Sequence, residues 1–537
     1  MNPKMTKYAA GFVLSVCAST LVLAGGLLIS GTGALADEGL ASFGHIAEPP
    51  EQPAAPQKKI VAPRKKAKAP AEPWGPVPTD KLSLINVAPG LLPFFNNAPV
   101  FGVPGTVLGD FWHRTQVTGD WGGVRTELAR NGLFIDVYTT STFQDVTSGG
   151  LKTGNSFVQN VQASLNLDTG RAGLWSGGLF HFTMQARYGS TPTDTFTVGS
   201  TVPQYVGFVL PGPLLSHDIL PSDYFFVQSI TPQFDVILGR ISDIFIPDQT
   251  LFADSYKFYF ANFNFNKNPM TTNFYNPTAW AALAVYTPAK WLAIVGGVLD
   301  PNTQANNFAT NAFNGVNLYL TAVISYQLGG LPGQLEPAFN WSNKPKIDLT
   351  SPFGPLTSLA QVSQAVGVLV GSPMTSGLPI NFQDQSWFAI ANVSQYLFVV
   401  DDPATIAKKL KSGDVINGIG LFGRVGYAPP ETNPITVDGS IALVAHGLFD
   451  IRQYDSFGVG YYYNAISNDL KNNVAQLTAG TSTVKDEQGI EIFYDFAITP
   501  AVRLIPSYQH IWQPLTAQVA TKQNEADVFL ARLTVVW

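Results

Sequence analysis

The stretch VFLARLTVVW (residues 528–537) has an alternating pattern that decides the fold class. Side chains of a β-strand point to opposite faces in turn, so every second residue shares a face. One face here is mixed, with Arg532 and Thr534 among aliphatic residues, and the other is entirely apolar. The apolar face consists of Phe529, Ala531, Leu533, Val535 and Trp537. The pattern predicts a strand with one face in an apolar medium and the other in a polar one.

The same alternation recurs along the chain. In GLFHFTMQARYG (residues 178–189), His181, Gln185 and Arg187 share one face, and mostly apolar side chains share the other. Such segments run for about ten residues, close to the ~9 to 11 that a tilted strand needs to cross a bilayer. Sixteen of them occur, starting near Leu133, Phe157, Leu179, Tyr224, Phe234, Trp280, Trp291, Val316, Leu335, Trp387, Gly418, Gly439, Phe457, Ile490, Val502 and Val528.

The connections between these segments alternate between long and short. Tight turns such as TPQ, TPAK and ITPA separate longer connections near 189–223, 243–279, 299–315, 343–386 and 467–489. An outer-membrane barrel shows this asymmetry, because one rim carries short periplasmic turns and the other long extracellular loops. The sequence therefore predicts an all-β, transmembrane antiparallel β-barrel of about 16 strands over residues 133–537.

One connection, VVDDPATIAKKLKSGDVIN (residues 399–417), is long where a short turn is expected. Asp402 is a suitable N-cap and Pro403 suits the first position of a helix. We expect a short periplasmic helix here. Tryptophans fall at predicted strand ends, as an aromatic girdle at each membrane interface requires. They are Trp175, Trp280, Trp291, Trp387, Trp512 and Trp537.

Composition supports a membrane protein without helical spans. Only 13% of residues are charged, against about 25% in typical globular proteins. The only long apolar run lies at residues 8–36, behind Lys4 and Lys7, and ends in Ala34-Leu35-Ala36. This run is typical of a secretory signal peptide, so we expect residues 1–36 to be removed after Ala36.

Residues 37–110 are expected to form a periplasmic linker rich in proline, alanine and lysine. Such a composition keeps a chain extended and unable to bury a core. Its basic cluster at 58–68 suits either a solvated spacer or a tether to an anionic polymer such as the cell wall. The net charge of −6 does not indicate a nucleic-acid partner.

Residues 111–132 are expected to form a short helical segment at the barrel mouth. There TELARNG carries a small apolar stripe, and Asn131-Gly132 is a helix stop signal. Asp120, Trp121 and Arg125 form the periplasmic-mouth motif. Arg125 and Glu127 are expected to fix this helix near the periplasmic mouth as a structural brace.

Several passages resemble the OprB-type carbohydrate-selective porin family of bacterial outer membranes. The clearest is TGDWGGVRTELARNGLFIDVYTT (residues 118–140), which is similar to the family's Gly-Asp-Trp-Gly-Gly-x-Arg run, short helix and first strand. Further similar passages are LGRISDIFIPD, YNPTAWAALAVYTPAKWLAIVGGVLDPN, GIGLFGRVGYAPPETNPI and IEIFYDFAITPAVRLIPSYQHIWQP. The resemblance implies a sixteen-stranded barrel through which small sugars diffuse passively, without a cofactor or an energy source.

Charged and polar residues on the mixed strand faces are candidates for lining the channel. An arginine facing lipid near the midplane costs about 2 to 4 kcal/mol, so these faces should point into the lumen. They offer hydrogen bonds to sugar hydroxyls, or they form salt bridges that brace the barrel; the sequence leaves both roles open. The candidates are Asp136, His181, Gln185, Arg187, Glu336, Arg424, Glu491, Arg503 and Arg532.

The long connection at residues 243–277 is expected to fold inward and narrow the channel. Its aromatic residues could stack against sugar rings, or they could pack the loop onto the wall. The residues singled out in this constriction loop are Phe252, Asp254, Tyr256, Tyr259 and Phe263.

Other functions are weighed against the sugar porin. The six histidines form no motif with a serine, and no metal-binding spacing such as H-E-x-x-H occurs, so an enzyme and a metal site are not expected. A general or ion-selective porin for other small solutes is the alternative. Partners would be small sugars and outer-membrane lipid, and the sequence leaves a monomer or a homo-oligomer open.

Overall fold

The computed structural model describes residues 107–190, 197–208, 219–242, 250–251, 256–275, 278–303, 312–370, 377–412 and 415–537. The predicted signal peptide and nearly all of the predicted linker lie outside these residues, and so do Phe252 and Asp254 of the predicted constriction loop.

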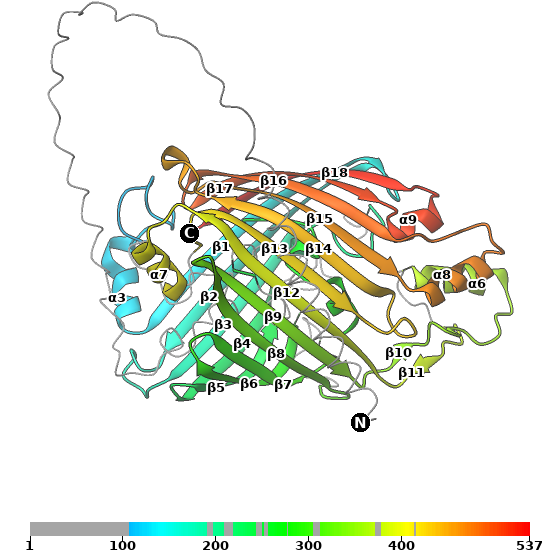
Figure 1. Ribbon diagram of the computed structural model, residues 1–537, viewed down its shortest axis with the longest axis horizontal. Helices are drawn as coiled ribbons and strands as arrows, with labels where there is room; N and C mark the ends of the chain where they lie inside the picture. Colours follow the sequence, from blue (N-terminus) through cyan, green and yellow to red (C-terminus); the bar gives the residue numbers. More distant parts are fainter. Residues whose placement is uncertain are drawn as a thin grey trace, which may run out of the picture.

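Sixteen antiparallel strands form a single closed barrel (Figure 1). Each strand pairs with the barrel strands that come before and after it in the sequence, and β1 pairs with β18 to close the ring. Each of the sixteen predicted segments is one of these strands, so the predicted fold class is confirmed. The strands are β1 (Leu133–Gly149), β2 (Gly154–Asp168), β3 (Gly178–Gly189), β4 (Ile219–Thr231), β5 (Phe234–Ser242), β6 (Thr278–Ala289), β7 (Leu292–Leu299), β8 (Asn317–Leu328), β9 (Leu331–Ser342), β12 (Ser386–Val399), β13 (Gly418–Tyr427), β14 (Ile435–His446), β15 (Ser456–Ile466), β16 (Glu487–Thr499), β17 (Val502–Trp512) and β18 (Glu525–Val536).

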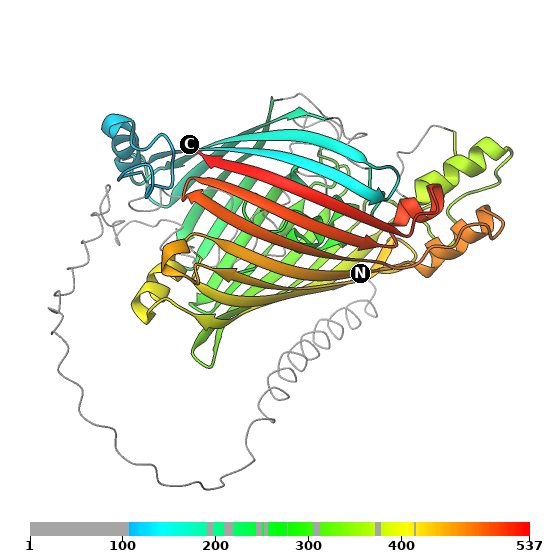
Figure 2. The same ribbon diagram turned by 90° about the horizontal axis from the view of Figure 1, so that it is seen from above.

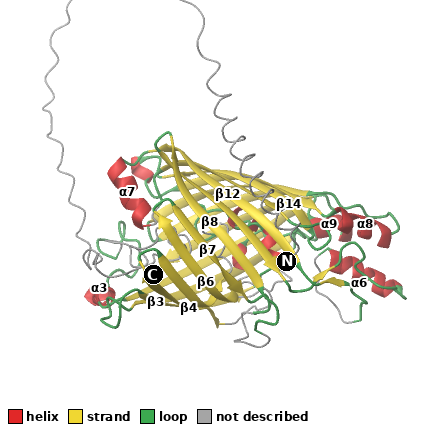
Figure 3. Cartoon of the chain, turned by 60° about the horizontal axis from the view of Figure 1, so that its bottom comes forward, coloured by secondary structure: helices red, strands yellow, loops and turns green. Residues whose placement is uncertain are grey.

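The two ends of the barrel differ, as the alternation of connection lengths predicts. The turn end carries the tight turns together with α3 (Val124–Arg130), α7 (Pro403–Ser412) and Trp537 (Figures 1 and 2). The loop end carries helices that the sequence analysis did not predict, and a small separate sheet (Figure 3). These elements are α6 (Leu359–Leu369), α8 (Asn468–Leu477), α9 (Leu515–Ala520), β10 (Lys346–Ile347) and β11 (Phe382–Gln383).

Both predicted helices at the turn end are confirmed. Asp402 caps α7, because its carboxylate accepts hydrogen bonds from the backbone N–H groups of Ala404 at 3.0 Å and Thr405 at 3.2 Å. Helix α3 ends at the predicted stop signal: Asn131 is its C-cap, and Gly132 follows with a φ of 86°. Positive φ is the conformation in which a glycine ends a helix without steric cost.

Side chains of the wall alternate between an exposed apolar outer face and a covered inner face. Phe143 and Phe157 lie opposite each other across β1 and β2 and are 43% and 49% exposed. Their chain neighbours Thr142 and Val158 form the next rung and point inward, where both are fully buried. Within the described residues, none of the helices has the length and apolar character needed to span a membrane. Much of the inner face is buried because chain segments run inside the barrel and pack against it.

Candidate functional site

Residues 256–275, called the internal segment below, belong to the connection between β5 and β6 and run inside the barrel. Near its start, Arg532 of β18 donates from both terminal nitrogens, one to the carbonyl oxygen of Tyr256 and the other to that of Tyr259. Thr534, two residues further along the same inner face, donates to the carbonyl oxygen of Lys257 at 2.8 Å. This end of the segment is therefore fixed to β18.

The middle of the internal segment is held by one carboxylate. Glu491 of β16 accepts hydrogen bonds from the backbone N–H groups of Ala261 at 2.8 Å and Asn262 at 2.9 Å. Its side chain is completely buried. Bonds from neutral donors to a charged acceptor are stronger than bonds between neutral groups. Arg424 of β13 adds a further anchor by donating to the carbonyl oxygen of Phe265 at 2.8 Å.

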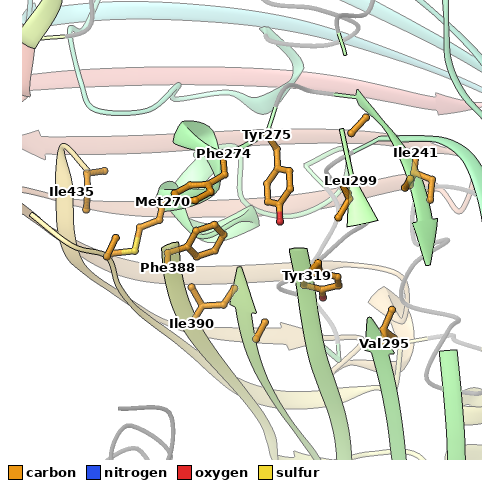
Figure 4. Packing of buried hydrophobic residues seen from close by; sticks show 14 of the residues in the cluster. Ile241, Met270, Phe274, Tyr275, Val295, Leu299, Tyr319, Phe388, Ile390 and Ile435 are labelled. Atoms are coloured by element: carbon orange, nitrogen blue, oxygen red, sulfur yellow. The ribbon is translucent and has the colours of Figure 1, made fainter. Parts of the chain in front are cut away.

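The far end of the internal segment packs into an apolar cluster of the wall (Figure 4). The ring centroids of Phe274 and Phe388 of β12 are 4.6 Å apart, and Met270 lies beside them in the same cluster. The side chain of Asn317 of β8 donates to the carbonyl oxygen of Phe274 at 2.9 Å. The segment therefore crosses the interior from β18 to β8 and β12.

Asparagines give the internal segment its local structure. The side-chain oxygen of Asn262 accepts from the N–H of Asn264 and caps α5 (Phe263–Asn266). Asn268 does the same for η5 (Pro269–Asn273), which has proline at its first position. Asn268 also donates to both carboxylate oxygens of Asp438 on β14, at 2.8 Å each. The caps fix the local backbone of the segment, and the contacts with the wall fix its position inside the barrel.

A second stretch, residues 197–208 of the connection between β3 and β4, accompanies the internal segment. The carboxylate of Glu487 accepts from the backbone N–H of Thr201 at 2.8 Å, and the N–H of Val206 donates to the carbonyl oxygen of Ala261 at 3.1 Å. The rings of Tyr205 and Tyr256 meet edge to face at 5.8 Å. Sequence reasoning missed this stretch, for which the only signal is the run of apolar residues in TVPQYVGF.

The structure places all nine predicted pore-lining residues on the inner face of the wall. Eight of them are less than 9% exposed, and Arg503 keeps 19% of its side chain accessible. They do not form one ladder. They fall into three groups, on β9 and β13, on β16 to β18, and on β1 and β3.

The first group is a transverse row. Asn392 of β12 lies directly between Glu336 of β9 and Arg424 of β13. The side chain of Asn392 is 2% exposed, and neither its nitrogen nor its oxygen has a hydrogen-bond partner in the described structure. Buried polar atoms without partners are costly, by about 1 to 3 kcal/mol each. Asn392 was not among the predicted residues.

The second group surrounds the start of the internal segment. It contains Glu491 and Arg532, which bind the segment backbone, and Arg503, which forms an ion pair with Asp495 of β16. The sequence left two roles open for these residues, hydrogen bonding to solute and bracing of the barrel, and the residues of this group differ in their contacts. Glu491 and Arg532 act as anchors, whereas Arg503 retains a surface toward the interior.

In the third group, His181 and Gln185 form hydrogen bonds within the wall. His181 contacts Asn166 through Nδ1 at 2.7 Å and Thr183 through Nε2 at 2.8 Å. Gln185 donates to the hydroxyl of Ser222 at 2.9 Å. Arg187, on the same face of β3, and Asp136 of β1 are also buried. This group lies on other strands than the first two groups, and its strand β1 pairs with β18 of the second group.

Most aromatic residues of the internal segment pack against protein. Tyr256 and Phe263 are 2% and 6% exposed, which agrees with the packing interpretation for these two residues. Phe258 and Tyr259 keep part of their surface accessible. The guanidinium of Arg503 lies 5.4 Å from the ring centroid of Phe258. Phe258, Tyr259 and Arg503 are called the aromatic step below, and they form the accessible part of this region.

Lys257 is a buried cation that sequence reasoning also missed. It is 2% exposed, and its ammonium has no hydrogen-bond partner in the described structure. The ammonium lies 4.6 Å from the ring centroid of Tyr256 and 5.4 Å from that of Tyr138. Cation–π contacts of this kind offset part of the desolvation cost.

At the loop end, Lys346 of β10 ties the small sheet to the internal segment. Its ammonium donates to the carbonyl oxygen of Asn273 and lies 4.7 Å from the ring centroid of Phe274. Burial and, to a smaller degree, the neighbouring cation of Lys344 lower the pKa of Lys346 from 10.5 to about 7. Lys346 lies outside the membrane-spanning strands.

This pKa predicts that the contact strengthens as the pH rises from about 7 to 10.5. In that pH window, a Lys346 side chain that has left the contact and reached water is protonated, whereas the side chain in the contact is neutral. The unbroken contact therefore gains stability as the pH rises, by at most about 5 kcal/mol. Hydrogen-exchange protection of the Phe274 and Tyr275 amides should therefore increase between pH 7 and 10. Lys346→Met should abolish the increase, and Lys290→Met at the turn end should not. Equal slopes for wild type and Lys346→Met would contradict the prediction.

The predicted mouth motif lies against the pair β1 and β18. Asp120 accepts from the backbone N–H and the hydroxyl of Thr126, both at 2.7 Å. The guanidinium of Arg125 lies 4.5 Å from the ring centroid of Trp121, which belongs to η2 (Trp121–Gly123). Arg125 is 6% exposed.

Comparison with known proteins gives a consistent result. The family model described as "Carbohydrate-selective porin, OprB family" matches residues 152–535, which leaves the motif at 118–140 outside the match. The high-pH structure of Pseudomonas putida OprB is 17% identical, covers 80% of this chain and 100% of that chain, and has a TM-score of 0.65. Its low-pH structure is 16% identical over 79% and 99% of the two chains, with a TM-score of 0.47. A search of curated proteins finds no match.

Proposed function

The chain belongs to the OprB family of carbohydrate-selective porins, and we propose that its internal segment determines which solutes pass. The protein is a porin of the bacterial outer membrane that allows passive, sugar-selective diffusion. Family and fold are those of a channel rather than an enzyme. In such barrels the short turns face the periplasm and the long loops face the exterior.

The observation that carries the proposal is the anchored internal segment with its aromatic step. A sixteen-stranded barrel encloses a lumen wide enough for water and solutes, so selectivity must come from what narrows it. The segment is bound to β18, β16, β13 and β8, which fixes the accessible rings of Phe258 and Tyr259 in the interior. A pyranose presents a flat face of C–H groups that suits such rings, and hydroxyls that suit Arg503.

One charged group of the wall supports the same proposal. Arg503 keeps 19% of its side chain accessible, whereas the eight other predicted pore-lining residues are less than 9% exposed. A sugar hydroxyl can accept a hydrogen bond from a guanidinium. We propose that Arg503 contacts water and sugar. The predicted tether of the linker to the cell wall stays a prediction.

Liposome swelling tests the function. Purified protein in liposomes should admit glucose and a disaccharide faster than neutral amino acids of similar size. The reason is that the rings of the aromatic step match sugar rings and Arg503 matches sugar hydroxyls. Equal rates for sugars and amino acids would contradict sugar selectivity, and no swelling in any solute would contradict the channel itself. Liposomes containing heat-denatured protein serve as the control.

A further inference from the structure

The residues before the barrel contact both strands of its closing pair. The backbone N–H of Val117 donates to the carbonyl oxygen of Val536 on β18 at 2.8 Å. The N–H of Trp537 donates to the carbonyl oxygen of Val137 on β1 at 2.9 Å, and its indole N–H donates to the hydroxyl of Thr139 at 3.0 Å. The two backbone bonds lie at and beyond the last rung of the pair, Tyr138 opposite Val536.

Arg125 joins the same two strands through one side chain. Its Nη2 donates to the carbonyl oxygen of Ile135 on β1 at 2.8 Å and to that of Trp537 at 2.9 Å. Its Nη1 donates to the carbonyl oxygen of Gly119 at 3.2 Å. A guanidinium has five donors in a fixed planar arrangement, so it can bind several carbonyls at once. Either strand alone would supply only part of this site.

The turn before Arg125 is built to present it. Trp121, Gly122 and Gly123 have φ angles of 51°, 70° and 100°, all in the left-handed region. Glycine adopts such angles without steric cost, so the Gly-Gly pair allows the chain to reverse here. The Trp121 ring then covers the guanidinium, and its indole N–H donates to the hydroxyl of Thr118 at 2.9 Å. Asp120 fixes the first turn of α3 through Thr126.

We propose that residues 117–126 form a clasp that binds only the closed barrel and holds the pair β1–β18 shut from its periplasmic end. That pair joins strands about 400 residues apart, so no short turn limits its opening, unlike the hairpins elsewhere in the wall. The clasp supplies the missing local connection. Because Arg125 needs carbonyls from β1 and from Trp537, the clasp can dock only after closure.

Hydrogen exchange in detergent micelles tests the clasp on the full-length protein. Arg125→Leu should speed exchange of the Trp537 amide at least about tenfold, because this amide donates to Val137 across the pair and opening the pair no longer breaks the guanidinium bonds. The Val536 amide donates to Ala501 on the β17 side, so its rate should stay close to that of wild type. Amides between β8 and β9 should exchange at the wild-type rate in the same sample. Arg130→Leu, at an exposed position of the same helix, is the matched control and should leave every rate unchanged.

A second variant covers the case in which Arg125→Leu does not fold. Gly123→Ala keeps Arg125, and the added Cβ meets no atom within 4 Å, so it acts only through the φ of 100°. It should speed exchange of the Trp537 amide, by less than Arg125→Leu does. A wild-type exchange rate at Trp537 in a folded variant of either kind would overturn the proposal. Sugar entry in the swelling assay should be retained, which separates failure of the clasp from failure of the channel.

Discussion

Arg532→Leu should let through sugars that the wild-type channel excludes, with trisaccharide entry rising at least about tenfold. Arg532 is fully buried and binds the carbonyl oxygens of both Tyr256 and Tyr259. Hydrogen bonds to charged groups contribute about 1.5 to 3 kcal/mol each, and both are lost in the variant. The start of the internal segment is then released from β18 and can move away from the lumen. Swelling of liposomes in a trisaccharide, relative to glucose, measures the change.

Thr534→Val is the matched control for this prediction. Thr534 lies on the same face of the same strand and donates one neutral hydrogen bond to the segment, at Lys257. Its loss should cost about 1 kcal/mol and leave the exclusion limit close to that of wild type. Arg532→Lys should give an intermediate result, because an ammonium retains charge but loses the planar geometry. A folded Arg532→Leu barrel that excludes the trisaccharide as strictly as wild type would refute the anchoring role.

The double substitution Phe258→Ala and Tyr259→Ala should remove most of the preference for sugars over amino acids. Both rings belong to the aromatic step, where part of each side chain is accessible. We expect the ratio of glucose to amino-acid entry to fall about fivefold, which corresponds to ~1 kcal/mol. The anchors bind backbone atoms of the segment, so truncating these side chains should leave its path intact. Swelling rates in glucose and in a neutral amino acid of similar size give the ratio.

Phe263→Leu provides the comparison, because Phe263 belongs to the same segment but is packed against protein and 6% exposed. Its substitution should leave the ratio unchanged. Single-channel conductance in salt solution checks that the pore of the double variant remains open. A double variant with normal conductance and an unchanged ratio would show that the rings do not select sugars.

The barrel was predictable because its signal is local. Each strand alternates with period two whatever it pairs with, and the side of the wall on which Arg532 or Glu491 lies follows from that alternation. The helix α7 was predictable for the same reason, since its cap and first residue are adjacent in sequence. Outer helices such as α9, which has only six residues, carry too short a pattern to be recognised inside a loop.

The interior was not predictable in detail, because its contacts join distant parts of the chain. Ala261 and Glu491 are 230 residues apart, and Tyr256 and Arg532 are 276 apart. Alternation shows that a charged side chain points inward, but it does not show whether the side chain meets water or a carbonyl oxygen. Arg532 and Glu491 were predicted to line the channel, and in the structure they bind the internal segment.

The bond between Val117 and Val536 brings two positions 419 residues apart in the sequence into contact. The described chain thus returns to the place where it enters the wall, and the barrel is a ring of hairpins interrupted at one point. This interruption lies at the turn end of the barrel, so the long connections at the loop end cover a rim at which the ring of strands is continuous.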